Sequence, residues 1–200
     1  MTIKVAIFDL DGTITEPYFD FESIKIEMGL GADSGPVWEA MAAMPPQKRE
    51  KADRILKKHE QLGVEKSTLN PTAFQALESL RNENINLAIL TRNTKENAIA
   101  VLQKHALKFD YVVGREDGPV KPDAFGVIHI CEYFGVRNDQ AIMVGDYLFD
   151  LQCAKTAGAV AILLANTAKA KEFVEYADYV IKSLDEIPEI VKNHNQGNII

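Results

Sequence analysis

The sequence predicts an α/β fold: a doubly wound parallel sheet that carries a small all-helical insertion. Six short apolar runs, the first of them rich in β-branched residues, alternate with helical patterns, and this alternation predicts a parallel sheet covered on both faces. One stretch, residues 17–68, shows helical patterns only and separates the first run from the other five. The predicted strands are 3–8, 86–90, 109–113, 141–144, 159–164 and 179–181.

The helical stretch follows the first predicted strand after a short irregular segment. Its helices are expected at 21–28, 37–44 and 47–62. Gly63 is expected to end the last of them. That helix carries a basic stripe, which is most often a solvated face but could also meet an acidic substrate. The stripe consists of Lys48, Lys51, Arg54 and Lys58. The expected domains are a core of residues 1–16 and 69–200 and a helical domain of residues 17–68.

In the core, a predicted helix precedes each later strand, and four of these helices carry a recognisable start or stop signal. Asn70-Pro71 reads as an N-cap followed by proline at the first helical position. Asn93 with Glu96 resembles a capping pair for the following helix. Two later helices end at glycine, Gly135 and Gly158. The predicted helices are 71–82, 93–105, 122–135, 148–157, 169–175 and 184–192.

Composition indicates a globular protein and argues against nucleic acid and anionic membranes as partners. Of the 200 residues, 46% are apolar and 26% charged, and the net charge of −7 comes without a long basic run, so nucleic acid and anionic membranes are poor partners. No signal peptide or transmembrane stretch is recognised. Cys131 and Cys153 suggest no disulfide framework, and the histidines show no metal-ligand spacing. We expect a cytoplasmic protein, a monomer or weak homodimer.

Two carboxylates follow the first predicted strand, within the sequence FDLDGTIT of residues 8–15. Side chains two apart on an extended chain point the same way, so Asp9 and Asp11 are expected to face one spot at the strand's carboxyl end. Two like charges held close are unfavourable unless they share a cation or a proton. Asp-Gly is also a common turn dipeptide, so this stretch alone fits an ordinary turn equally well.

Polar residues recur where later strands end. Each is individually a common helix-capping, turn or surface residue. Ligands of open α/β sheets bind at the carboxyl ends of the strands, so their joint occurrence there predicts a site. Carboxylates suit Mg²⁺, and a nucleophilic carboxylate with a hydroxyl, a lysine and an acid suits phosphoryl transfer. The residues are Thr91, Arg92 and Asn93 after the second strand, Lys121 after the third, and Asp146 with Asp150 after the fourth.

These residues, in this order, resemble the four motifs of the haloacid dehalogenase-like (HAD) hydrolase superfamily. DLDGT is similar to the first motif, Thr91 to the second, Lys121 to the third and GDYLFD to the fourth, over residues 9–150. The resemblance implies a Rossmann-like core with a cap domain formed by the helical stretch. The Asp-x-Asp form resembles the phosphatase and phosphomutase branches, and the second Asp argues against dehalogenation.

The resemblance also implies a role for each residue. Asp9 would be the nucleophile that becomes an aspartyl phosphate, and Asp11 the general acid and base. The phosphoryl group would be bound by Thr91, the backbone amide of Arg92 and Lys121, with Lys121 also neutralising charge during catalysis. The Mg²⁺ ligands would be Asp9, the backbone carbonyl of Asp11 and Asp146, while Asp150 would support the metal shell or ligate the metal through water.

The implied function is a Mg²⁺-dependent phosphatase acting on a small phosphorylated metabolite. Glu16-Pro17 follows the first motif, where many phosphoglycolate phosphatase-like and β-phosphoglucomutase-like members have Asp-Ser or Asp-Thr, and the insertion is shorter than their four-helix caps. Their substrates are therefore not transferred. A phosphomutase of the β-phosphoglucomutase type shares all four motifs, and a phosphonate hydrolase would need a cap lysine in an apolar context. A non-catalytic phosphate-binding or regulatory protein is the alternative from another class.

Overall fold

The chain divides into two compact units in the computed structural model, which describes residues 2–31 and 33–197. One unit combines Met1–Pro17 with Thr68–Ile200, and the other is Tyr18–Ser67. The larger unit contains every strand found in the described residues and all the predicted site residues, so it is described first.

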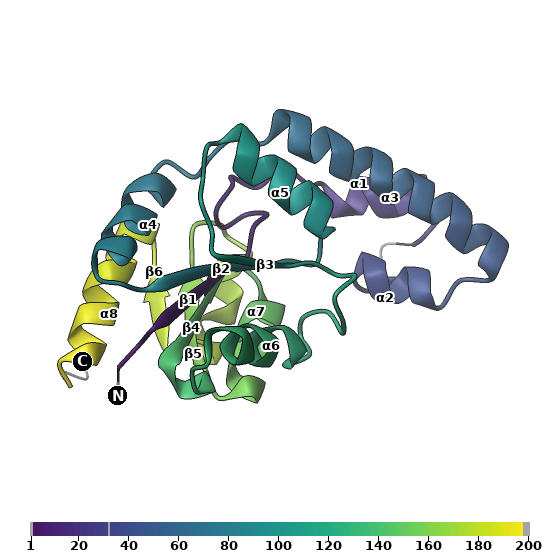
Figure 1. Cartoon of the computed structure of the whole chain (residues 1–200). Coiled ribbons are helices and arrows are strands. Elements are labelled where there is room, and N and C mark those ends of the chain that lie inside the picture. The colour runs from purple at the N-terminus through teal and green to yellow at the C-terminus, as the bar shows by residue number, and fades with distance from the viewer. Residues whose placement is uncertain (1, 32, 198–200) are drawn as a thin grey trace. The chain divides into compact units, whose positions relative to one another are not determined.

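The larger unit is built on a six-stranded sheet in the order β3-β2-β1-β4-β5-β6, in which every neighbouring pair is parallel (Figure 1). This confirms the predicted doubly wound α/β fold. The strands are almost uninterrupted apolar runs because helices bury both faces of a parallel sheet. They are β1 (Val5–Phe8), β2 (Asn86–Leu90), β3 (Tyr111–Val113), β4 (Ala141–Gly145), β5 (Val160–Leu164) and β6 (Tyr179–Ile181).

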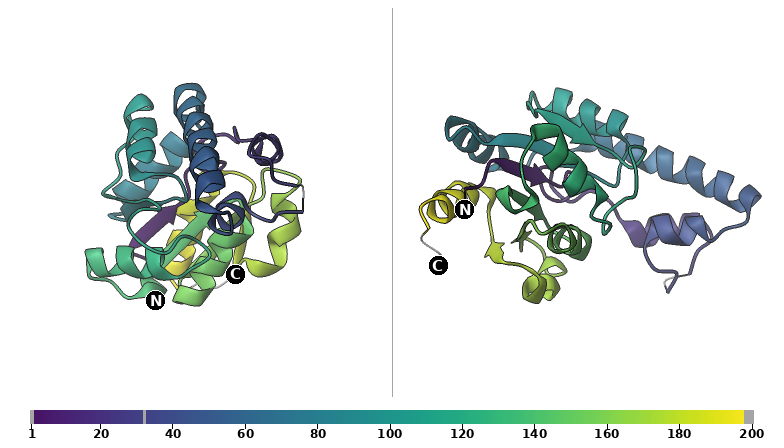
Figure 2. Two further views of the ribbon diagram at one scale, coloured as in Figure 1. Left: turned by 90° about the vertical axis from the view of Figure 1, so that its right-hand side faces the viewer. Right: turned by 60° about the horizontal axis from the view of Figure 1, so that its bottom comes forward.

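Helices lie on both faces of this sheet (Figures 1 and 2). One face carries α4 (Ala73–Asn82), α5 (Lys95–Lys104) and α8 (Ile187–Asn195). The other carries α6 (Phe125–Phe134) and α7 (Leu148–Ala157), which pack against alternate strand residues such as Val5 and Ile7 in one apolar core. Three short 3₁₀ helices complete the unit: η1 (Asn138–Gln140), η2 (Ala170–Tyr176) and η3 (Leu184–Glu186).

Some predicted helix boundaries are wrong. The segment 169–175, expected as an α-helix, forms instead the 3₁₀ helix η2, which begins at Ala170. Helix α4 begins at Ala73 and not at Pro71, because the Asn70 side chain accepts a hydrogen bond from Thr72 N (3.2 Å) in a local turn. Asn70 Nδ2 also donates to the Thr13 carbonyl (3.1 Å), so this turn is fixed to the loop that follows β1.

The described residues of the smaller unit form helices α1 (Phe21–Glu27), α2 (Val37–Ala42) and α3 (Pro46–Lys66). Helix α3 packs against both others. Its buried Ala52 and Leu56 meet Val37 and Met41 of α2 in a small apolar core. The basic stripe of α3 is exposed, and two of its four members form ion pairs: Arg54 with Glu50 and Lys58 with Glu27.

The prediction that Gly63 ends helix α3 is wrong. The helix continues to Lys66. A glycine inside a helix costs about 1 kcal/mol relative to alanine, so its presence there needs a reason. A Cβ at Gly63 would lie 2.5 Å from Cζ of the Phe19 ring. The glycine therefore lets this aromatic ring pack directly on the helix backbone.

Two further expectations concern thiols and membranes. Cys131 and Cys153 are free and buried, and burial raises the pKa of their thiols to about 11 and about 12. Within the described parts of the chain, none of the helices is both long enough and apolar enough to cross a bilayer.

Candidate active site

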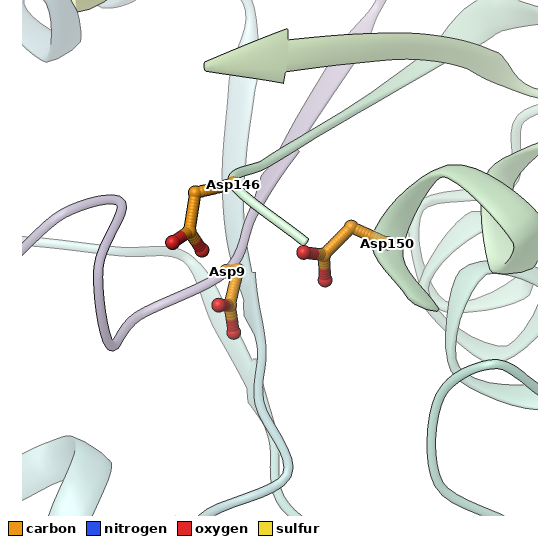
Figure 3. A group of neighbouring side chains, drawn as sticks. All are labelled: Asp9, Asp146 and Asp150. Carbon is orange, nitrogen blue, oxygen red and sulfur yellow. The ribbon is translucent and has the colours of Figure 1, made fainter. Parts of the chain in front are cut away.

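Three carboxylates meet at the carboxyl edge of the sheet (Figure 3). Asp9 directly follows β1, and Asp146 follows the neighbouring strand β4, so strand pairing brings these two residues together. Asp150 joins them from the first turn of α7. One oxygen from each of the three side chains lies within 4.8 Å of the others. Such crowding of like charges is unfavourable without a cation.

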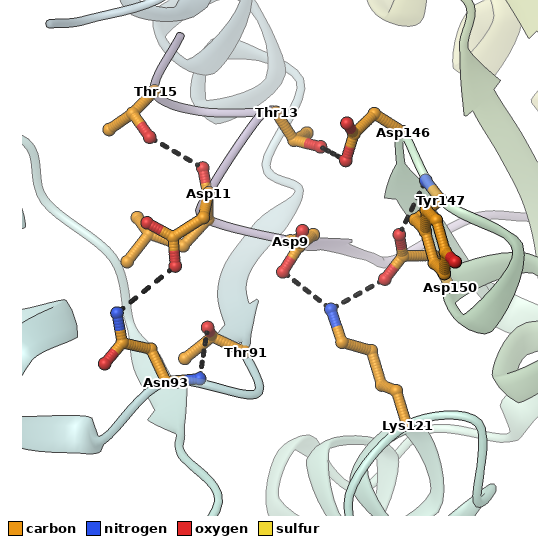
Figure 4. Close-up of polar contacts among 11 residues, drawn as sticks. Asp9, Asp11, Thr13, Thr15, Thr91, Asn93, Lys121, Asp146, Tyr147 and Asp150 are labelled. Carbon is orange, nitrogen blue, oxygen red and sulfur yellow. Dashed lines mark hydrogen bonds and ion pairs between the residues drawn. The ribbon is translucent and has the colours of Figure 1, made fainter. Parts of the chain in front are cut away.

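Lys121 supplies one cation within this group, from the loop that precedes α6 (Figure 4). Its Nζ donates to Asp9 Oδ1 and to Asp150 Oδ1, both at 2.6 Å, and its side chain is only 3% exposed. Burial lowers the pKa of this lysine, but the two carboxylates outweigh burial and raise the pKa above its ordinary value. Lys121 is therefore held as an ammonium between the two acids.

Asp150 is fixed at both of its oxygens. Oδ1 accepts from Lys121, and Oδ2 accepts from the backbone N–H of Tyr147 (3.1 Å). A Cβ at Gly145 would lie 2.2 Å from Cγ of Asp150, so glycine at the end of β4 leaves the space this carboxyl occupies. Burial raises the pKa of Asp150, while Lys121 acts in the opposite direction.

The turn after Asp11 lies close to Asp146. Gly12 has φ +93°, and a Cβ there would lie 2.7 Å from Asp146 Oδ2, so both the backbone conformation and the close approach require glycine. Thr13 Oγ1 donates to Asp146 Oδ1 at 3.5 Å. The DLDGT motif thus contributes both the carboxylates and the turn that holds the carboxylate of the fourth motif.

Asp11 and Thr91 are connected through Asn93, in the turn between β2 and α5 (Figure 4). Asn93 Nδ2 donates to Asp11 Oδ2 (3.3 Å), and the backbone N–H of Asn93 donates to Thr91 Oγ1 (3.0 Å). The Arg92 guanidinium lies over the Phe149 ring, 4.7 Å from its centroid. Only the backbone amide of Arg92 was predicted to bind phosphate, and this side-chain contact leaves that prediction unaffected.

Sequence reasoning missed what Asn93 does. It took Asn93 as the helix cap, but the N-cap of α5 is Thr94, whose side chain accepts from Asn97 N (3.1 Å). The sequence did offer the correct cap, because Thr94 is itself a good N-cap residue and stands next to Asn93. The contact of Asn166, whose Nδ2 donates to the Gly12 carbonyl (3.3 Å), could not be recognised in the sequence, because Asn166 lies 154 residues from Gly12.

The three carboxylates of Asp9, Asp146 and Asp150 fit a hard divalent cation such as Mg²⁺, whose preferred ligands in proteins are oxygens. Burial, followed by the charges of Asp9 and Asp150, raises the pKa of Asp146 to about 8. A proton or a cation therefore relieves the repulsion in this group, and the two should compete for Asp146.

We expect Asp146→Asn to stabilise the protein in EDTA at alkaline pH. The folded chain binds the Asp146 proton more tightly than the unfolded chain, so the linked stability is complete below about pH 4 and is lost as pH rises through about 8. Asparagine has no charge and keeps an oxygen for Thr13. At about pH 8.5 the variant should melt at least ~2 °C above the wild-type protein, as about 1 kcal/mol implies at this chain length.

Calorimetry at about pH 5 and about pH 8.5 measures this difference, which should shrink at the lower pH. Added Mg²⁺ should raise the melting temperature of the wild-type protein more than that of the variant. Asp139→Asn is the matched control, because Asp139 pairs with Arg137 at the surface. An Asp146→Asn protein that melts below wild type at alkaline pH would contradict the idea of charge crowding.

Fold and site together define the class: an α/β enzyme whose carboxylate-rich site lies at the carboxyl edge of a parallel sheet. The chain belongs to the haloacid dehalogenase-like hydrolase family, whose family model matches residues 30–164, and it is a hydrolase. The matched segment includes Thr91, Lys121 and Asp146, whereas Asp9 and Asp11 precede it.

Relatives and solved structures extend the similarity over most of the chain. A haloacid dehalogenase-like hydrolase domain-containing protein of Arabidopsis thaliana is 29% identical over 181 residues, covering 84% of this chain and 73% of the relative. A phosphoglycolate phosphatase of Chromobacterium violaceum is 25% identical over 227 residues, covering 96% of this chain and 97% of the relative. The structure of a hydrolase from Pseudomonas syringae superimposes with a TM-score of 0.80 at 19% identity, covering 94% of this chain and 98% of that one.

Proposed function

We propose that this protein is a Mg²⁺-dependent phosphatase that hydrolyses a small phosphomonoester metabolite through an aspartyl-phosphate intermediate. The observation that carries the proposal is the buried Lys121 ammonium held 2.6 Å from Asp9 Oδ1. A carboxylate with an adjacent fixed cation suits attack on an anionic phosphoryl group, because the cation offsets the charge of both. The relative from Chromobacterium violaceum, named a phosphoglycolate phosphatase, supports the phosphatase branch.

In the first step a carboxylate oxygen of Asp9 attacks phosphorus. The bond from phosphorus to the ester oxygen breaks as the new bond to Asp9 forms, and Asp11 gives its proton to the departing oxygen, so an alcohol leaves. Proton delivery matters because an alkoxide is a poor leaving group.

In the second step water attacks the phosphorus of the aspartyl phosphate. Asp11, now a carboxylate, takes a proton from that water, the bond between phosphorus and Asp9 breaks, and inorganic phosphate leaves. Both residues return to their starting states, so the reaction consumes one ester and one water and yields one alcohol and one phosphate.

Three groups are proposed to bind the transferring phosphoryl group. Thr91 Oγ1 already accepts the Asn93 N–H, which leaves its own hydroxyl hydrogen to donate to a phosphoryl oxygen. The backbone amide of Arg92 and the ammonium of Lys121 would add two further donors. Charge spread over the phosphoryl oxygens in the transition state makes such fixed donors effective.

Asp9, Asp146 and Asp150, with the backbone carbonyl of Asp11, would hold Mg²⁺. Bound there, Mg²⁺ would supply positive charge that offsets repulsion between the carboxylate nucleophile and the phosphate.

We also propose that the helical residues 17–68 act as a cap that selects the substrate. The support is their place in the chain, since they leave the core directly after the DLDGT motif. Exchanging this segment for that of a relative should change which substrates are preferred. An unchanged preference would exclude the cap role.

A panel of phosphomonoesters, assayed for inorganic phosphate with and without Mg²⁺, tests the proposed function. We expect Mg²⁺-dependent phosphate release from at least one small metabolite, with loss of activity in EDTA and recovery on adding Mg²⁺. Isomerised sugar phosphate without free phosphate would instead indicate the phosphomutase. Mg²⁺ binding without turnover of any ester would favour a non-catalytic phosphate-binding or regulatory protein.

A cytoplasmic location and a monomer or weak homodimer are part of the proposal. The buried free thiols of Cys131 and Cys153 support a reducing compartment. Fractionation of cells that express the tagged protein, and light scattering of the purified protein, would contradict these expectations by finding it outside the cytoplasm or in a stable higher oligomer.

A further inference from the structure

We propose that Asn93, held in place by Asn97, is the positioning residue for Asp11. The inference rests on the proposed function, because Asn93 can affect catalysis in this way only if Asp11 delivers a proton to the leaving oxygen. It adds two amide side chains, outside the four motifs, to the machinery of the site.

Asn93 is buried, 7% exposed, in the turn between β2 and α5, and both ends of its side-chain amide are engaged. Oδ1 accepts from the backbone N–H of Thr94 (2.8 Å) and from Asn97 Nδ2 (2.9 Å). Nδ2 donates to Asp11 Oδ2 (3.3 Å), as Figure 4 shows.

These partners determine which way the amide points. The Thr94 N–H can only donate, so the amide oxygen must face it. A flipped amide would set its NH₂ group against that donor and its oxygen against the Asp11 carboxyl. Asn93 therefore presents a fixed N–H donor to Asp11, and Asn97 reinforces this orientation from one helical turn further on.

Helix capping does not account for this arrangement. The first turn of α5 is already capped, because Thr94 Oγ1 accepts from the backbone N–H of Asn97. The Asn97 side chain is therefore not needed for the cap, and its amide donates to Asn93 instead. The Asn93 amide, in turn, donates away from the helix and toward the site.

A donor at Oδ2 limits rotation of the Asp11 carboxyl, because a rotated carboxyl would lose the hydrogen bond from Asn93 Nδ2. Asn93 also donates its backbone N–H to Thr91 Oγ1, so one residue sets the proton carrier relative to the phosphate-binding hydroxyl. Such fixed geometry matters, since a displacement of about 1 Å can cost about 10²-fold in rate.

The test compares two substrates that differ in their need for a proton. The alkoxide of β-glycerophosphate leaves poorly without one, whereas p-nitrophenolate leaves readily. Asn93→Asp keeps the oxygen that accepts from Thr94 and replaces the donor to Asp11 with a carboxylate oxygen. We expect kcat/KM for β-glycerophosphate to fall about 10²-fold and kcat/KM for p-nitrophenyl phosphate to change by less than about 3-fold.

Two further variants keep the test falsifiable. Asn97→Ala frees the Asn93 amide but retains the backbone cap, so it should give the same selective loss at about 10-fold. Asn86→Ala is the control, because Asn86 lies at the amino end of β2 and donates to Lys4 O, at the opposite edge of the sheet. An equal loss on both substrates, or no loss on either, would overturn the proposal.

Crystal structures of the wild type and of Asn93→Asp provide a readout that needs no turnover. The Asp11 carboxyl should be rotated away from its wild-type position in the variant. An unmoved Asp11 would overturn the positioning role, even if the wild-type protein hydrolyses neither ester. Failure of the wild-type protein to hydrolyse either ester would, on its own, count against the proposed function, so the two failures are distinguishable.

Discussion

Asp9→Asn should lower the rate of phosphate release by at least about 10⁴-fold, because an amide oxygen cannot replace a carboxylate as the nucleophile. The substitution keeps the shape of the side chain, and Lys121 retains Asp150 as a buried partner. The variant should therefore fold and bind substrate normally. Steady-state kinetics on the preferred phosphomonoester, together with thermal melting, measures both expectations.

The control for this prediction is Asp139→Asn, an identical change at a surface position that pairs with Arg137. It should leave turnover within about 2-fold of wild type, since surface ion pairs contribute little. Turnover by Asp9→Asn at a rate near wild type, in a preparation free of contaminating phosphatase, would exclude Asp9 as the nucleophile.

Lys121→Met should destabilise the folded protein strongly. It removes the ammonium that pairs with Asp9 and Asp150, side chains that are only 12% and 2% exposed. Breaking a buried ion pair by deleting one partner costs about 3–5 kcal/mol, because the other charge is left without compensation. Phosphate release should also fall by at least about 10²-fold, since a fixed cation for the phosphoryl group is lost.

Denaturant unfolding of Lys121→Met, with and without Mg²⁺, measures this loss. Mg²⁺ should restore part of the lost stability, because the three remaining carboxylates can share a divalent cation. Lys155→Met is the matched control, because Lys155 pairs with Asp178 at the surface and its loss should cost at most about 1 kcal/mol. If Lys121→Met unfolds as wild type does, the buried pair contributes nothing to stability.

The sequence was sufficient to predict the sheet and two of the carboxylates, Asp9 and Asp146, that meet at its carboxyl edge. Buried parallel strands must be apolar runs, so β1 and β4 could be recognised and Asp9 and Asp146 placed at their ends. Parallel topology then requires these ends to meet at one edge. Lys121, 112 residues from Asp9, could be placed near the site because it follows the third strand, but its role could be inferred only through the resemblance to a family, because nothing local indicates its partners.

What the sequence could not predict depends on side-chain packing. Gly63 looks like a helix stop, and only the Phe19 ring beside it explains why glycine stands inside a helix that continues to Lys66. Asn93 reads as a helix cap until Thr94 is seen to fill that role. In both cases a residue with a strong local preference serves a contact with a distant part of its own unit, and local preference alone cannot reveal such a contact.

The central claim is that Asp9 becomes covalently phosphorylated, and mass spectrometry of protein quenched in acid during turnover tests it most directly. With the preferred phosphomonoester and Mg²⁺, we expect a phosphoryl group on the peptide that contains Asp9, absent from Asp9→Asn and lost when the substrate is exhausted. Steady phosphate release with no phosphorylated Asp9 peptide, or with the phosphoryl group on another residue, would contradict the account.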